Sequence, residues 1–163
     1  MSDPLGPTTG PPLPTYAARV RAIRTILGNH VPFGGLIQNN RAANPIPPYV
    51  CLSATWGVSV TATPTLSIAI HHVEDVAKEV DLLRYAADRD AYELRRDRED
   101  EFALVQPDLS SVWVVAGGCE VHLVHHGINP EKLVEPAIEI ARTVGCTPYT
   151  DDYVPPPLPQ DSA

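Results

Sequence analysis

The chain has 163 residues, of which 44% are hydrophobic and 20% are charged, and its formal net charge is -8. This composition is typical of a single globular domain with a buried core. The acidic balance disfavours nucleic-acid binding and attachment to an anionic membrane surface. No apolar run is long enough to cross a bilayer, and the first residues lack the basic and apolar regions of a secretory signal.

These features predict a cytoplasmic protein, or a virion protein if a phage encodes it. Lys78 and Lys132 are the only lysines among many arginines, and Ala, Pro and Val are abundant, which suggests an actinobacterium or one of its phages. The three cysteines, Cys51, Cys119 and Cys146, are odd in number and far apart. This spacing favours three buried thiols over a disulfide framework.

Both ends of the chain are rich in proline, which lacks a backbone N–H and disfavours helices and central strands. We therefore expect proline-rich tails at residues 1–15 and 150–163, around a single domain at residues 16–149. The tails should be extended and polyproline-like. They are either unconstrained ends or arms that dock on a partner.

The first predicted element is a helix, with Thr15 as its cap and Gly28 as its stop. Apolar residues recur in it at steps of three and four. Residues 28–48 hold several glycines, asparagines and prolines, and these predict a long irregular segment. Alternatively, a short strand lies within residues 33–40.

Strands are predicted next, because residues 49–56, 58–63 and 65–72 are rich in β-branched and aromatic side chains. Residues 73–87 carry an apolar stripe at helical spacing and begin with acidic residues, which suits a helix start. The charged run at residues 88–101 either extends this helix or forms a strand and turn. Its alternating charges are typical of a solvated surface.

The clearest local pattern is a β-hairpin, formed by two apolar runs that flank Gly117 and Gly118. In this register Trp113 should oppose His122. A last helix should begin with Asn129 as its cap and end at Gly145. Pro136 inside it should either kink the helix or separate its first turn.

Together these elements predict an α+β fold in the order α-βββ-α-ββ-α. We expect an antiparallel sheet of about five strands with the helices on one face. Residues 66–80 and 120–134 share the sequence of a strand, two histidines and a helix. This weak internal similarity suggests two related ββα units.

The segment CEVHLVHHG at residues 119–127 raises the question of a metal site. Two strands end in paired histidines, and imidazoles that converge at one edge of the sheet could hold zinc, with a nearby carboxylate completing the set. The candidate ligands are His71, His72, His122, His125 and His126. The usual zinc spacings are absent, so the opposing interpretation is that these are strand-end histidines bonded to backbone or water.

The same histidines could act as general bases, because imidazole titrates near neutral pH. A nucleophile would then be needed, but Cys119 is expected to face the core, where a thiol is inert. No nucleophile elbow and no glycine-rich phosphate loop is present. The sequence therefore contains no catalytic motif of high specificity.

Four side chains are candidates for binding a partner protein. Trp56 and Trp113 are aromatic residues that need a cover if one face of the sheet is open. Arg19 and Arg24 lie on the polar sides of the first helix and could meet an acidic partner, although such charges often form only a solvated face.

The order of elements over residues 16–145 resembles the small acidic chaperones of type III secretion, in topology only. Small phage tail and head-completion proteins are a second, looser parallel. The first resemblance implies a dimer that holds a partner chain, and no site residue is carried over from either group.

The leading hypothesis is a non-catalytic interaction or assembly protein that oligomerises and binds another protein, without a cofactor. It is either a chaperone or adaptor, or a phage or particle subunit. The alternative is a histidine-based, metal-dependent enzyme that uses the strand-end histidines with zinc.

Overall fold

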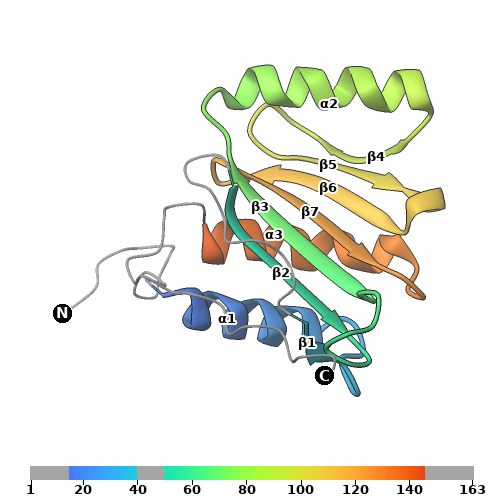
Figure 1. Ribbon diagram of the computed structural model, residues 1–163. Helices are drawn as coiled ribbons and strands as arrows, with labels where there is room; N and C mark the ends of the chain where they lie inside the picture. The colour runs from blue at the N-terminus through green and yellow to red at the C-terminus, as the bar shows by residue number, and fades with distance from the viewer. Residues whose placement is uncertain (1–14, 40–49, 146–163) are drawn as a thin grey trace.

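The computed structural model describes residues 15–39 and 50–145. Within them, seven strands form one antiparallel sheet in the order β1-β2-β3-β7-β6-β5-β4 (Figure 1). The strands are β1 (Ile37–Gln38), β2 (Val50–Gly57), β3 (Leu66–His72), β4 (Glu93–Asp97), β5 (Phe102–Gln106), β6 (Ser111–Ala116) and β7 (Cys119–His125). The helices are α1 (Tyr16–Gly28), α2 (Val76–Asp90) and α3 (Val134–Val144), with short 3-10 turns η2 (Pro107–Leu109) and η3 (Pro130–Leu133). The α+β class is therefore confirmed.

The predicted strand count and order were wrong in detail. Residues 58–63 form turns and bends rather than a strand, and Val58 is 67% exposed, so its β-branched side chain lies mostly in solvent. Strand β5 was missed, because it is apolar on both faces. Strand β4, which is almost entirely charged, realises the strand and turn that were one alternative for residues 88–101, although α2 also extends to Asp90. Neither strand shows the alternation of a half-buried strand. The short strand predicted as an alternative within residues 33–40 is present as β1.

The β6–β7 hairpin forms as predicted. Gly117 and Gly118 have φ of 59° and 79°, a left-handed pair that glycine adopts without steric cost. Trp113 pairs with His122 as expected, and Ala116 pairs with Cys119. Cys119 is fully buried, as is Cys51, while Cys146 lies outside the described residues.

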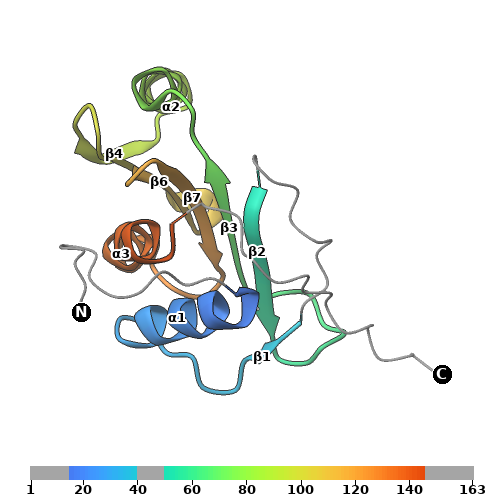
Figure 2. The same cartoon turned by 90° about the vertical axis from the view of Figure 1, so that its left-hand side faces the viewer.

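Helices lie on both faces of the sheet, which corrects the prediction that they share one face. Helices α1 and α3 pack on one side over the main core (Figure 2). Helix α2 packs on the opposite side, where Val80 and Ala87 contact Phe102, Leu104 and Val115. Because β5 and β6 are apolar on both faces, their second face also needs a cover.

The last helix splits at its start, which was one of the two outcomes predicted for Pro136. The side chain of Asn129 accepts a hydrogen bond from the backbone N–H of Glu131 and starts the separate 3-10 turn η3. Pro136 is the third residue of α3. It needs no intrahelical donor there, so α3 continues without a kink.

Thr15 caps α1 as predicted, accepting from the N–H of Ala18 at 3.1 Å. The rest of the predicted tails, residues 1–14 and 150–163, lie outside the described part of the chain. No helix within residues 15–39 and 50–145 is long and apolar enough to cross a membrane.

Helix α2 ends in an unfavourable backbone conformation. Ala91 has φ of 59° and ψ of 37°, the left-handed region that costs an L-residue about 1–2 kcal/mol. We expect Ala91→Gly to raise the free energy of unfolding by about 0.5–1 kcal/mol, measured by urea denaturation. The matched control, Ala86→Gly inside the same helix, should lower it by about 1 kcal/mol. Destabilisation of both variants would contradict the assignment of Ala91 as a strained cap.

Candidate functional site

The three strands β2, β3 and β7 have one covered and one uncovered face. Successive side chains of a strand point to opposite sides. Leu52, Ile68 and Val121 point toward α1 and α3 and are buried in the main core. No described helix or strand lies over the other side of these three strands, because α2 covers only β5 and β6 there (Figures 1 and 2).

We call this uncovered side the open face. It consists of the partly exposed side chains Ser53, Thr55, Ser67, Ala69, His71, His122 and Val124. They are hydroxyls, imidazoles and small aliphatic groups, with no lysine, arginine or aspartate among them. The open face can therefore donate and accept hydrogen bonds without presenting a fixed charge.

A stacked ring pair closes the open face on the side of β6. Trp113 lies flat on His122, with ring centroids 4.0 Å apart and planes 11° apart. The indole N–H of Trp113 donates to Gln106 Oε1 at 2.9 Å, and Ser111 Oγ donates to the same oxygen. These bonds hold the ring pair in one orientation and satisfy the polar end of the partly buried indole.

Two glutamates meet where α2 passes the end of the open face. Glu120 on β7 pairs across the ladder with His71 on β3, and its carboxyl group shares a hydrogen bond with Glu79 on α2. Burial, followed by this hydrogen bond and the charge of Glu79, raises the pKa of Glu120 to about 9. Glu120 is therefore a neutral carboxylic acid at neutral pH.

The two histidines of the open face are neutral as well. Burial, with the charge of nearby His71 as a smaller cause, lowers the pKa of His122 to about 4. Burial also lowers the pKa of His71, although the charge of Glu79 opposes that shift. All three titratable groups on this side of β3 and β7 are thus shifted toward their uncharged forms.

Two polar atoms of the open face are buried without a hydrogen-bond partner. They are Thr55 Oγ1 and His71 Nδ1. An unsatisfied buried polar atom costs about 1–3 kcal/mol. The open face therefore holds two destabilising polar atoms beneath its surface.

The five histidines predicted as metal ligands are not brought together. His71 and His122 lie on the open face, whereas His125 points to the core side, is 5% exposed, and bonds through Nδ1 to the carbonyl oxygen of His126 at 3.0 Å. His72 and His126 are exposed at strand ends. Among residues 15–39 and 50–145, no three His, Cys, Asp or Glu side chains are placed to hold a metal ion. The predicted zinc cluster is therefore not formed by the described residues.

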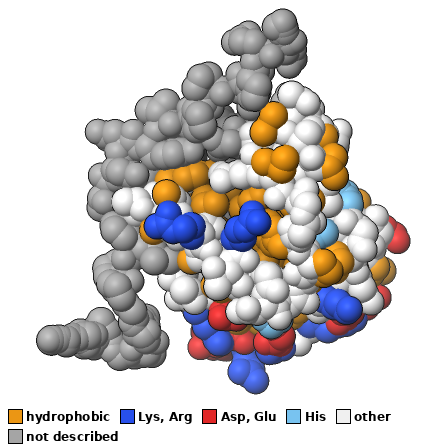
Figure 3. All heavy atoms as spheres, turned by 90° about the horizontal axis from the view of Figure 1, so that it is seen from below, with side chains coloured by type: hydrophobic (Ala, Val, Ile, Leu, Met, Phe, Trp, Pro, Cys, Tyr) orange, Lys and Arg blue, Asp and Glu red, His pale blue; other side chains and the backbone are white. Residues whose placement is uncertain are grey.

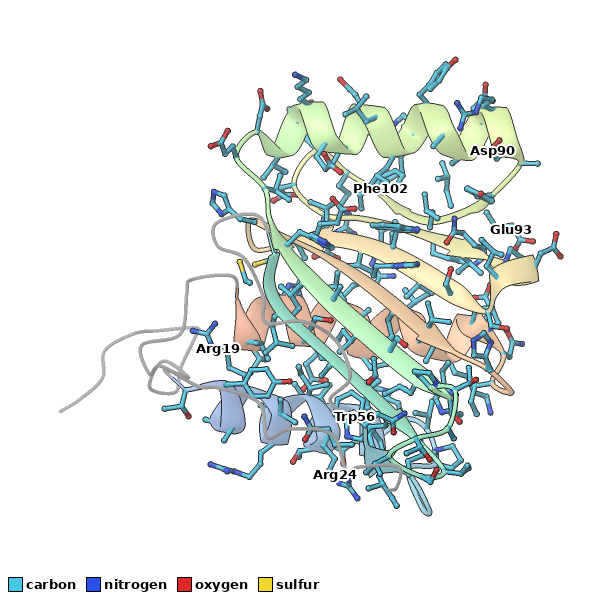
Figure 4. The ribbon with its side chains drawn as sticks, in the orientation of Figure 1. Arg19, Arg24, Trp56, Asp90, Glu93 and Phe102 are labelled. Carbon is cyan, nitrogen blue, oxygen red and sulfur yellow. The ribbon has the colours of Figure 1, made fainter. Side chains whose placement is uncertain are left out.

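Of the four predicted partner-binding residues, two are buried. Trp56 is 1% exposed on the α1 side of the sheet, edge-on to Phe33 with centroids 5.4 Å apart (Figure 4), and Arg19 is 2% exposed. Arg24 is exposed and lies over the Phe33 ring at 4.7 Å. Trp113 alone of the four borders the open face. Seen from the α1 side, basic groups lie among apolar side chains (Figure 3).

Reasoning from the sequence missed the role of Glu79 and Gln106. Glu79 is one of several acidic residues in a helix, and only the packing of α2 brings it to Glu120. Gln106 ends a strand that was not predicted. The one available signal was parity: Glu120 and His122 share a strand face, and Trp113 opposes His122.

Because of Glu120, we expect the free energy of unfolding to fall as the pH rises. A carboxyl group whose folded-state pKa is raised from 4.5 to about 9 stabilises the folded state fully below pH 4.5 and loses that contribution as pH rises toward 9. Glu120→Gln keeps a hydrogen-bonding side chain that does not ionise. We expect this variant to exceed the wild type in free energy of unfolding at pH 8 by at least about 1 kcal/mol, and to match it near pH 4. The control Glu99→Gln, on an exposed turn, should show no such trend in urea titrations.

His122 has the opposite effect: because of it, we expect the free energy of unfolding to fall as the pH falls. Its folded-state pKa of about 4 lies below the ordinary value of 6.5, so the stability it contributes is lost as pH falls from 6.5 to 4. His122→Phe should keep a ring on Trp113 without taking up a proton. Its unfolding free energy should fall by about 1 kcal/mol less than that of the wild type between pH 6.5 and pH 4. An unchanged slope, equal to that of His126→Phe, would contradict the assignment.

A family model matches residues 49–163 of the chain and is described as "Domain of unknown function (DUF7956)". The match contains β2 to β7, α2 and α3, and therefore the whole open face; it does not contain α1 or β1. No curated protein and no solved structure is significantly similar to the chain. The chain belongs to the DUF7956 family, a family defined by a domain of unknown function.

Proposed function

We propose that this protein is a non-catalytic interaction protein that holds a segment of another protein against the open face. One observation carries the proposal: three neighbouring strands present a partly exposed surface without fixed charge, on a chain whose formal net charge is -8. Charged side chains normally dominate a solvated surface. Their exclusion from one sheet face is typical of the centre of a protein–protein interface.

The charges are gathered on other elements. Arg84 on α2 bonds Asp81 and Asp97, and Arg96 on β4 bonds Glu101 and Glu135. These ion pairs lie around α2, β4 and α3, away from the open face. Solvated and uncharged surfaces are therefore separated on this molecule.

The chemistry of the open face limits the partner. A charged group brought against it would lose hydration without gaining a counter-charge, which is costly. A segment with small apolar side chains and neutral hydrogen-bonding groups would lose little.

Of the two variants predicted from the sequence, we favour the chaperone or adaptor over the particle subunit. The side chains that define the open face are short or ring-shaped, so this face presents no long aliphatic side chain. Tight interfaces usually pair a depression with a large anchoring side chain. Two copies of this face would lack such anchors, whereas a different protein can provide them.

The test is site-specific photo-crosslinking in cells, with a photoreactive amino acid replacing Ala69 or Val124 on the open face. Ala77 on α2 and Leu109 on η2 are the control positions. We expect the open-face positions, and not the controls, to trap one other protein. Crosslinks to a second copy of this chain, or equal yields at all positions, would contradict the proposal.

Binding of the trapped protein then measures the role of the open face. Ala69→Glu places a charge at its centre and should weaken binding at least about tenfold, equivalent to 1.4 kcal/mol, by calorimetry with purified proteins. The control Ala77→Glu adds the same charge on α2 and should leave the affinity unchanged. Thermal unfolding of both variants checks that the fold is intact.

A further inference from the structure

A hollow of about 540 Å³ lies between the second half of α2 and strand β4. It is separate from the open face, and its walls include Arg84, Ala87, Asp88, Ala91, Tyr92 and Leu94. Helix α2 rests on β5 and β6 through Val80 and Ala87 rather than on β4. The small alanines at its end leave the space beside β4 unfilled. This volume falls in the range of about 300–1,000 Å³ typical of binding pockets.

Two features at this hollow depart from what folding alone favours. Ala91 adopts the left-handed conformation at φ 59°, where a glycine would relieve the strain. Leu94 is 38% exposed on a strand whose other residues are charged. Ala91 turns the chain at the end of α2 near Asp90 and Glu93 (Figure 4) and so shapes one wall. Strain and exposed apolar surface at one place are typical of functional sites.

One carboxylate at the hollow, that of Asp88, has no opposite charge paired with it among the described residues. Arg84 donates to Asp97 at 2.6 Å and to Asp81 at 2.7 Å, so its charge is compensated. Arg89 is paired with Asp90 at 3.0 Å. Asp88 has no ion-pair partner within residues 15–39 and 50–145. The wall therefore combines apolar carbon from Tyr92 and Leu94 with an uncompensated negative charge.

We propose that this hollow is a second binding site, which takes a large aliphatic side chain next to a lysine or arginine from a partner polypeptide. The aliphatic group would cover Leu94 and the ring of Tyr92. The neighbouring cation would pair with Asp88. The net acidity of the chain would further attract a basic segment.

The test uses three capped dipeptides as probes: acetyl-Leu-Lys-amide, acetyl-Leu-Glu-amide and acetyl-Ala-Lys-amide. Each is titrated into the full-length, ¹⁵N-labelled chain, and the backbone amide shifts are followed by NMR. The leucyl-lysine probe should shift the amides of Ala87, Ala91, Tyr92 and Leu94 and bind at least about threefold more tightly than the other two probes, as expected for an apolar contact combined with an exposed ion pair. Equal responses to all three probes, or shifts scattered over the surface, would overturn the proposal.

Two variants separate the apolar and ionic contributions. Leu94→Ala should weaken the leucyl-lysine probe, and Asp88→Asn should remove its advantage over the leucyl-glutamate probe. Leu109→Ala and Asp108→Asn, on the exposed η2 turn, are the matched controls and should change neither affinity. If the Leu94 and Asp88 variants fold and bind as the wild type does, the hollow is not the site. Because the probes do not involve the open face, this outcome is independent of the crosslinking result.

Discussion

The pairing register of the β6–β7 hairpin is the constraint on which the rest of the structure depends. Gly117 and Gly118 set this register, because they occupy a two-residue turn with left-handed backbone angles. A slip of one residue would move every side chain of a strand to the opposite face. With the observed register, Val121 and Leu123 enter the core under α3, while Glu120 and His122 face the other way. Strand β3 pairs with β7 and continues the same division.

The face that points away from α1 and α3 is covered over some strands and uncovered over others. On β5 and β6 both faces are apolar, and α2 covers the second one. On β2, β3 and β7 the second face is small, polar and neutral, and no described element covers it. The junction between these regions holds Trp113 stacked on His122, and Glu120 bonded to Glu79. Burial there keeps the titratable groups uncharged, which gives the open face its chemistry.

The charged residues of β4 protect an exposed edge of the sheet from pairing with another strand. Strand β4 is an edge strand and would expose unpaired backbone groups to other chains. Four of its five residues are charged, and Arg95 bonds Glu93 on the same strand and Glu131 on η3. These charges oppose pairing with another strand. Each exposed pair contributes little to stability, typically about 0–1 kcal/mol, so we attribute to them control of association rather than rigidity.

The sequence by itself determined the local elements whose signals are contained in a few neighbouring residues: the Thr15 cap, and the Gly117–Gly118 turn with its register. For Pro136 it left two outcomes, a kink or a separate first turn, and the structure shows the second. The sequence also predicted the α+β class. It left residues 88–101 open between a longer helix and a strand with a turn, it did not reveal β5, which is apolar on both faces, and it did not decide which helix covers which face. Only the tertiary structure brought Glu79 to Glu120. The reason is that strand alternation is a property of one segment, whereas coverage and contacts between distant segments depend on how all the segments pack together.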